Sequence, residues 1–206
     1  MRYSIFIIAI SAMIFTACNN SSDGENKDNM SSMSNDTAKQ TITDDKDVKQ
    51  VTPGFTNVDA NTSGYVKNIV DHYLHIKNAL ANDNGSEAAN GAKMESQALA
   101  EVDKSFFTPD QKKVYDGIEE DLKEHAEHIG KNGDNIKHQR EHFSMMSEDV
   151  YDLVKAFGGG KALYHDFCPM YNENKGALWL SETKEIKNPY MGNKMPTCGR
   201  VEEVIK

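Results

Sequence analysis

The sequence has few residues of the kinds that cross-link or stiffen a chain: three cysteines, one tryptophan and five prolines among 206 residues. No two cysteines form a C-x-x-C pair, and neither a G-x-S-x-G motif nor a phosphate-binding glycine loop is present. The chain therefore lacks common signatures of nucleophilic and phosphoryl-transfer enzymes. From this absence we predict that the protein is not an enzyme.

Basic residues are outnumbered by acidic ones. Lys and Arg total 23 against 32 Asp and Glu, which gives a formal net charge of −9. Because phosphate binding requires clustered Lys and Arg, this balance argues against a nucleic-acid partner. Hydrophobic residues make up 38% of the chain, below the usual ~45–50%. A polar segment near the N-terminus accounts for part of the deficit, so the remainder still suffices for one domain of ordinary size.

The apolar run at the N-terminus, residues 5–15, has 11 residues and is too short to cross a membrane. Arg2 precedes it and the sequence F-T-A-C follows it, which predicts a lipoprotein signal peptide at residues 1–17. Acylation of Cys18 would then anchor the protein to a membrane by lipid. Asn19, rather than Asp, comes next and favours the outer membrane, with the protein facing the periplasm or the cell surface. The alternative is a plain secretory signal in which Cys18 is accidental.

The segment that follows the lipid-attachment site, residues 18–58, is rich in Asn, Ser, Asp, Thr and Lys and has no aromatic residue before Phe55. Such a segment buries too little apolar surface to offset the entropy cost of ordering it. We therefore predict a disordered tether between the lipid and the folded domain.

From about residue 60 the apolar residues recur every three or four positions, as in amphipathic helices. Residues 62–64 are expected to cap a first helix, and Thr108 with Pro109 to begin a third that runs to about residue 130. A fourth begins near residue 136 and ends at the glycines 158–160. For residues 59–206 we predict an all-α fold, an up-down-up-down four-helix bundle on which an irregular Cys- and Met-containing C-terminal segment packs.

Two of the seven histidines, His138 and His142, are four residues apart and so project from one face of the fourth helix, a spacing that can chelate a metal ion. The same residues match H-x-x-E-H, an inverted zinc-peptidase pattern. Such peptidases need a further Glu on a later helix, which is missing here, so this reaction is disfavoured. His125 lies on an apolar stripe and is expected to be a core residue. His72, His75 and His128 are expected to be ordinary surface histidines.

The richest stretch lies near the C-terminus and contains both remaining cysteines and the only tryptophan. Thiolate and thioether ligands next to a histidine suit a soft ion such as Cu(I). The predicted ligands are Cys168, Met170, Met195, Cys198 and His165. The alternative is a disulfide between Cys168 and Cys198 that serves only structure.

The ordered motifs F-C-P-M, G-A-x-W-L-S, I-x-N-P-Y-x-G and M-x-x-C-G within residues 164–204 resemble domain-of-unknown-function family 3347. The resemblance continues more weakly upstream and covers about residues 60–205. That family occurs in bacterial lipoproteins and in periplasmic adaptor subunits of heavy-metal efflux pumps. The resemblance implies copper or silver handling, but no reaction. Pro196 departs from the family, which often has an aliphatic residue there.

Two functional hypotheses follow. The first is a lipid-anchored envelope protein that binds a soft heavy metal, with Cu(I) as the expected ion, to buffer it or to pass it to an efflux system. The second is a structural or protein-interaction module without metal, cross-linked by a disulfide between Cys168 and Cys198.

Overall fold

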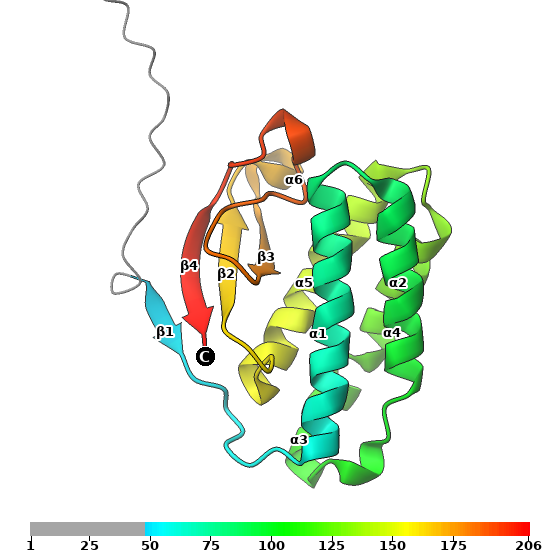
Figure 1. Cartoon of the computed structure of the whole chain (residues 1–206), viewed down its shortest axis with the longest axis vertical. Coiled ribbons are helices and arrows are strands. Elements are labelled where there is room, and N and C mark those ends of the chain that lie inside the picture. The colour runs from blue at the N-terminus through cyan, green and yellow to red at the C-terminus, as the bar shows by residue number, and fades with distance from the viewer. Residues whose placement is uncertain (1–47) are drawn as a thin grey trace, which may run out of the picture. The chain divides into compact units, whose positions relative to one another are not determined.

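The computed structural model describes residues 48–206, and this part of the chain is an α+β fold (Figure 1). The prediction of an all-α four-helix bundle is wrong, because helices make up 57% of these residues and a four-stranded mixed sheet a further 13%. The segment predicted to pack irregularly on the bundle supplies three of the four strands. Cys18 and the predicted signal peptide lie outside the described residues.

Four long helices form the helical layer, and each packs against the next one in this group. Shorter helices connect them or interrupt the later strands. The long helices are α1 (Ala60–Ala81), α2 (Gly85–Ala100), α4 (Glu119–Lys131) and α5 (Ile136–Phe157); the short ones are α3 (Pro109–Asp116), α6 (Tyr171–Asn174) and the 3-10 turns Lys104–Phe106 and Gly192–Lys194. Within residues 48–206, no helix combines the length and apolarity that a membrane span requires.

The helix ends follow local sequence signals. Thr108 caps α3 in a reciprocal capping box with Gln111, and Pro109 is its first residue, as predicted. Helix α1 begins earlier than expected, because the Asp59 side chain accepts a hydrogen bond from the Asn61 N–H at 2.8 Å. The predicted third helix is divided at Gly117, a poor helix former, and α4 restarts with three acidic residues in its first turn.

The sheet has the order β1-β4-β2-β3, in which β1 runs parallel to β4 and the other neighbours are antiparallel. Strand β1 lies within residues 18–58, the range predicted to be a tether, so ordered structure begins upstream of residue 59. The strands are β1 (Lys49–Val51), β2 (Leu163–Cys168), β3 (Ala177–Ser181) and β4 (Arg200–Ile205).

The sheet is fastened to the helices by buried tyrosines. Tyr73 of α1 accepts a hydrogen bond from the Leu180 N–H at 2.9 Å, and its hydroxyl also contacts that of Ser147 in α5 at 2.9 Å. Tyr190 donates to the carbonyl oxygen of Leu178. The backbone of edge strand β3 is therefore hydrogen-bonded to a tyrosine of the helical layer and to a tyrosine of the segment that follows β3. This arrangement joins the sheet and the helices around one core.

Candidate metal centre

Helices α4 and α5 are antiparallel neighbours joined by a short connection at residues 132–135 (Figure 1). Asn135 caps α5, and its side chain accepts a hydrogen bond from the His138 N–H at 3.2 Å, which fixes where the first histidine of α5 stands. Because the connection is short, a residue of α4 and a residue of α5 that are separated from it by similar numbers of residues lie side by side. His128 of α4 consequently meets His138 of α5.

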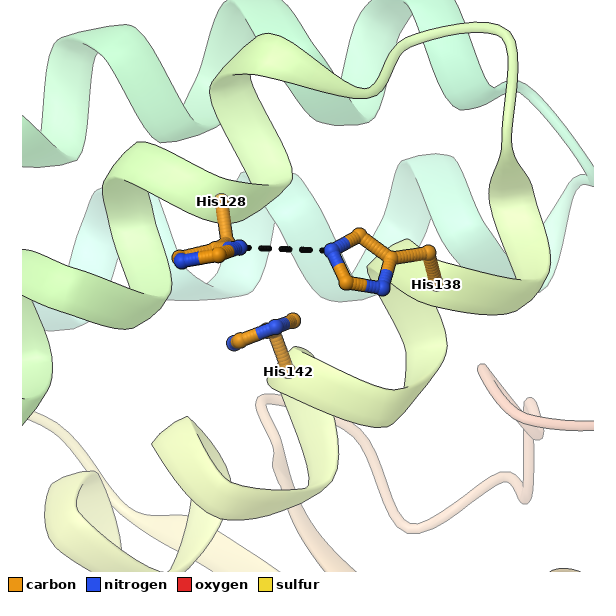
Figure 2. A group of neighbouring side chains, drawn as sticks. All are labelled: His128, His138 and His142. Carbon is orange, nitrogen blue, oxygen red and sulfur yellow. Dashed lines mark hydrogen bonds between the residues drawn. The ribbon is translucent and has the colours of Figure 1, made fainter.

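Four histidines meet in the seam between α4 and α5: His125, His128, His138 and His142, the histidine cluster below. The Nδ1 of His128 lies 3.3 Å from the Nε2 of His138 (Figure 2), and the Nδ1 of His125 lies 3.2 Å from the Nδ1 of His142. The rings of His128 and His142 are stacked, with centroids 4.1 Å apart. The cluster therefore brings together side chains from two helices.

Three of these histidines can offer nitrogen atoms to one ion. One ring nitrogen each from His128, His138 and His142 lies within 4.8 Å of the other two. Two nitrogens bound tetrahedrally at ~2.0–2.1 Å from an ion are roughly 3.3–3.4 Å apart. The pair His128–His138 already has this separation, and a nitrogen of His142 lies within 4.8 Å of both.

Burial and the neighbouring histidines favour the neutral form of His142. Burial, together with the neighbouring His128, His138 and His125, lowers the pKa of His142 to about 4. Burial also lowers the pKa of His125. A neutral imidazole has a free lone pair, so His142 does not have to lose a proton before it binds a metal ion at neutral pH.

Carboxylates stand beside the cluster at both ends. Glu141 Oε2 lies 3.6 Å from the Nδ1 of His138, the nitrogen that faces away from His128. Asp149 Oδ2 lies 3.9 Å from the Nε2 of His125. Burial, with nearby Asp121, raises the pKa of Asp149 to about 7. Metal-bound histidines commonly donate their second N–H to a carboxylate, and Glu141 is placed for that role.

The structure thus brings together His138 and His142, the pair predicted from the i,i+4 spacing. It adds His128, which the sequence interpretation treated as an ordinary surface residue. His125 is buried, in line with its predicted place on an apolar stripe. The signal that could have revealed His128 is the short connection, which pairs it with His138 across the seam.

The sulfur residues predicted from the C-terminal stretch gather elsewhere. Cys168 ends β2, and its Sγ lies 3.3 Å from that of Cys198; both are free thiols. Burial, with the adjacent Cys168, raises the pKa of Cys198 to about 11. Met170 and Met195 lie on the two turns next to these cysteines and are exposed, at 48% and 36%.

His165 does not join the cysteines. Pairing between β2 and β3 is regular from residue 164 to residue 168, so His165 and Cys168 face opposite sides of the strand. The His165 ring packs beside Tyr151 of α5, with centroids 4.5 Å apart, and neither ring nitrogen has a hydrogen-bond partner among the described residues. Burial lowers its pKa.

Residues 69–162 match the model of a family described as "Protein of unknown function (DUF3347)". The match confirms the family resemblance for these residues. The matched range contains the whole histidine cluster and ends before the two cysteines of the C-terminal stretch. No curated protein and no solved structure matches the chain.

Proposed function

We propose that the protein binds one transition-metal ion, copper as Cu(I) or Cu(II), between α4 and α5. The observation that supports this function is the convergence of His128, His138 and His142 within 4.8 Å. Imidazole suits copper and zinc, and the affinity series of divalent ions peaks at Cu(II). The proposed ligands are therefore nitrogens, in place of the sulfur set predicted from the sequence.

Three protein ligands leave room for a further ligand on a four-coordinate ion. His128 and His138 are only half-buried, so the site opens to solvent on their side. A site of this kind lets an incoming ligand displace the protein's own, which suits an ion that is buffered or handed on rather than locked into the fold. Transfer to a heavy-metal efflux adaptor, implied by the family resemblance, belongs to this proposal.

The binding test is a competition titration of the full chain against a chromogenic chelator, with Cu(II) and, under reducing conditions, Cu(I). One ion per chain is expected. Removing a hydrogen-bond partner of a ligand typically costs 10–100-fold in affinity, so His128→Gln and His138→Gln, which remove ligands, should each cost more than about 100-fold. His72→Gln, on α1 and outside the cluster, is the matched control and should bind as tightly as the unaltered chain. Equal copper affinities in all three variants would contradict the proposed site.

Glu141→Gln tests the carboxylate beside His138 separately. It removes the charge but keeps the shape, so affinity should fall by about 10–100-fold while the stoichiometry stays at one. Glu120, on the exposed side of α4, provides a control in Glu120→Gln. An unchanged affinity in Glu141→Gln would show that this carboxylate does not support the ion.

Lipid anchoring at Cys18, with the protein on the outer membrane, completes the proposal and is supported by the F-T-A-C motif in the sequence. Cys18→Ser should move the protein from the membrane fraction to the soluble fraction of the envelope. A variant that stays with the membranes after a carbonate wash would contradict the anchor and leave the metal site untouched.

A further inference from the structure

The two free thiols of the described chain stand apart from the histidine cluster and touch each other. We propose that Cys168 and Cys198 are an oxidation site, a dithiol that exchanges with an external disulfide and closes into a reversible disulfide of its own. This proposal is independent of the metal centre. It rests on how the two sulfur atoms are held and on which of them solvent can reach.

The backbone on each side of the pair is fixed by separate contacts. Cys168 is the last residue of β2 and pairs with Ala177 of β3. The carbonyl oxygen of Cys198 accepts a hydrogen bond from the Asn188 side chain at 2.5 Å. Asn188 is buried, and its Oδ1 in turn accepts bonds from the N–H groups of Tyr190 at 2.8 Å and Met191 at 2.9 Å. Neither cysteine is free to drift away from the other.

Gly199 lets the second cysteine come this close. Its φ is +146°, and a Cβ atom there would lie 2.8 Å from the Trp179 ring and 3.1 Å from the carbonyl oxygen of Phe167. Any other residue would push β4 away from β2 next to the thiols. The glycine after Cys198 therefore serves the approach of the two sulfur atoms.

The remaining distance is short. The sulfur atoms are 3.3 Å apart, and a disulfide bond is ~2.05 Å long, so closure requires a movement of roughly 1.2 Å. Side-chain rotations and small shifts of the turn at residues 195–198 can supply that movement. The reduced pair is thus organised for the bond before any oxidant arrives.

The difference in solvent exposure between the two cysteines determines which of them reacts first. Cys168 is fully buried, whereas Cys198 is partly exposed, so an external disulfide meets Cys198 first. The Cys198 thiolate attacks one sulfur of that disulfide and expels the other as a thiolate, leaving a mixed disulfide. Cys168 then attacks the Sγ of Cys198 and expels the second external thiolate. The two cysteine protons pass to the two released thiolates, and the external disulfide has been reduced by two electrons.

Closing the bond would link residues 30 positions apart in the sequence and hold the segment between β3 and β4 against β2. Restricting the unfolded chain by a loop of this length should raise the melting temperature by about 5–15 °C. A dithiol reductant should reverse the change. Because burial raises the pKa of Cys198 to about 11, little of this thiol is thiolate at neutral pH, and exchange should become faster as pH rises.

The test incubates the reduced full chain with oxidised glutathione and maps cysteine-containing peptides by mass spectrometry, which separates both sites from Cys18. The unaltered chain should lose two hydrogens as Cys168 bonds to Cys198, with the rise in melting temperature given above. Cys168→Ser should stop at a glutathione adduct on Cys198. Cys198→Ser should leave Cys168 unmodified.

The unaltered chain alone can test whether Cys168 and Cys198 form a reversible disulfide, even if a variant fails to fold. If Cys168 and Cys198 both stay free at saturating oxidised glutathione, the proposal is overturned. It is equally overturned if Cys168 acquires glutathione before Cys198 does, because the order of attack would then be wrong. A bond that a dithiol reductant cannot reopen in the folded protein would contradict its reversibility.

Discussion

The α4–α5 seam and the C-terminal stretch both hold reactive side-chain atoms at almost the same separation. Nitrogen pairs in the seam are 3.2 and 3.3 Å apart, and the two sulfur atoms are 3.3 Å apart. The seam, however, is partly open and flanked by carboxylates, whereas Cys168 lies deep against the sheet. Similar distances therefore point to different chemistry: an ion in the seam, whose charge the carboxylates can balance, and a covalent bond at the sheet.

The comparison also shows what distinctive residues do in this chain. Trp179 of β3 is fully buried, Asn188 fixes the turn before β4, and Tyr190 reaches the helical layer. The motifs that carried the family resemblance thus contribute packing and backbone hydrogen bonds. The histidines that meet in the seam lie in helices whose sequence looks ordinary.

The largest expected effect tests whether the sheet region excludes charge. Burial raises the pKa of Asp166 to about 8, against a usual value near 3.8, and neither carboxylate oxygen has a hydrogen-bond partner among the described residues. The folded chain keeps a proton that the unfolded chain releases, so this residue lowers stability increasingly as pH rises from about 4 to about 8. The rise of the pKa from 3.8 to about 8, at ~1.4 kcal/mol per pKa unit, sets an upper value of about 6 kcal/mol.

Asp166→Asn removes that titration. Its free energy of unfolding relative to the unaltered chain should increase by up to about 6 kcal/mol between pH 4 and pH 9, measured by denaturant titration. Glu120→Gln, at an exposed carboxylate, should show no such trend. A difference that does not vary with pH would mean that Asp166 is already ionised in the folded protein.

The second effect concerns the residue that links the two regions. Phe143 of α5 is fully buried, stacks on Tyr73 at 5.1 Å between ring centroids, and packs beside Tyr190. Phe143→Ala should cost about 3–5 kcal/mol in unfolding free energy. Lys137→Ala, at an exposed site one and a half turns earlier on the same helix, should cost under about 0.5 kcal/mol. Similar small losses in both would place Phe143 outside the core.

The third effect separates the two candidate sites by stability. At 100 times its dissociation constant, an ion that binds only the folded state adds about 2.7 kcal/mol. Thermal melting of the reduced chain should show this gain with Cu(I), and Cys168→Ser should retain it. His128→Gln should lose it. The reverse pattern, with the gain lost in Cys168→Ser, would move the ion from the seam to the thiols.

The smallest effect is expected from the exposed thioethers. Replacing Met170 and Met195 together with leucine conserves volume and apolarity, so each site should cost less than about 1.5 kcal/mol. Because the seam is the proposed site, Cu(I) affinity in the competition titration should stay unchanged. A clear loss of affinity in a variant that still melts cooperatively would restore the thioethers as ligands.

The sequence was sufficient to locate the long helices, although not the break at Gly117, because their apolar residues repeat with the helical period over three or more turns. The predicted start of α3 and end of α5 follow from Thr108, Pro109 and Gly158, whose effects on the backbone are local. The strands could not be found in this way. Each has three to six residues, and β1 pairs with β4 across a separation of 154 positions, so no local period marks them.

The candidate site was likewise predictable only where its residues belong to the same helix. His138 and His142 share one helix, so their common face was readable from a spacing of four. His128 belongs to another helix, and its contribution depends on how α4 and α5 pack. The closeness of Cys168 and Cys198 depends likewise on the β2–β4 register, which sequence spacing does not contain.

The most direct test of the central claim is X-ray absorption at the copper edge on the reduced full chain loaded with one equivalent of Cu(I). The ion should show only light-atom neighbours, with the multiple-scattering pattern of imidazole rings, and this pattern should weaken in His128→Gln and persist in Cys168→Ser. A sulfur neighbour in the unaltered chain that disappears in Cys168→Ser would contradict the account and assign the metal to the C-terminal stretch.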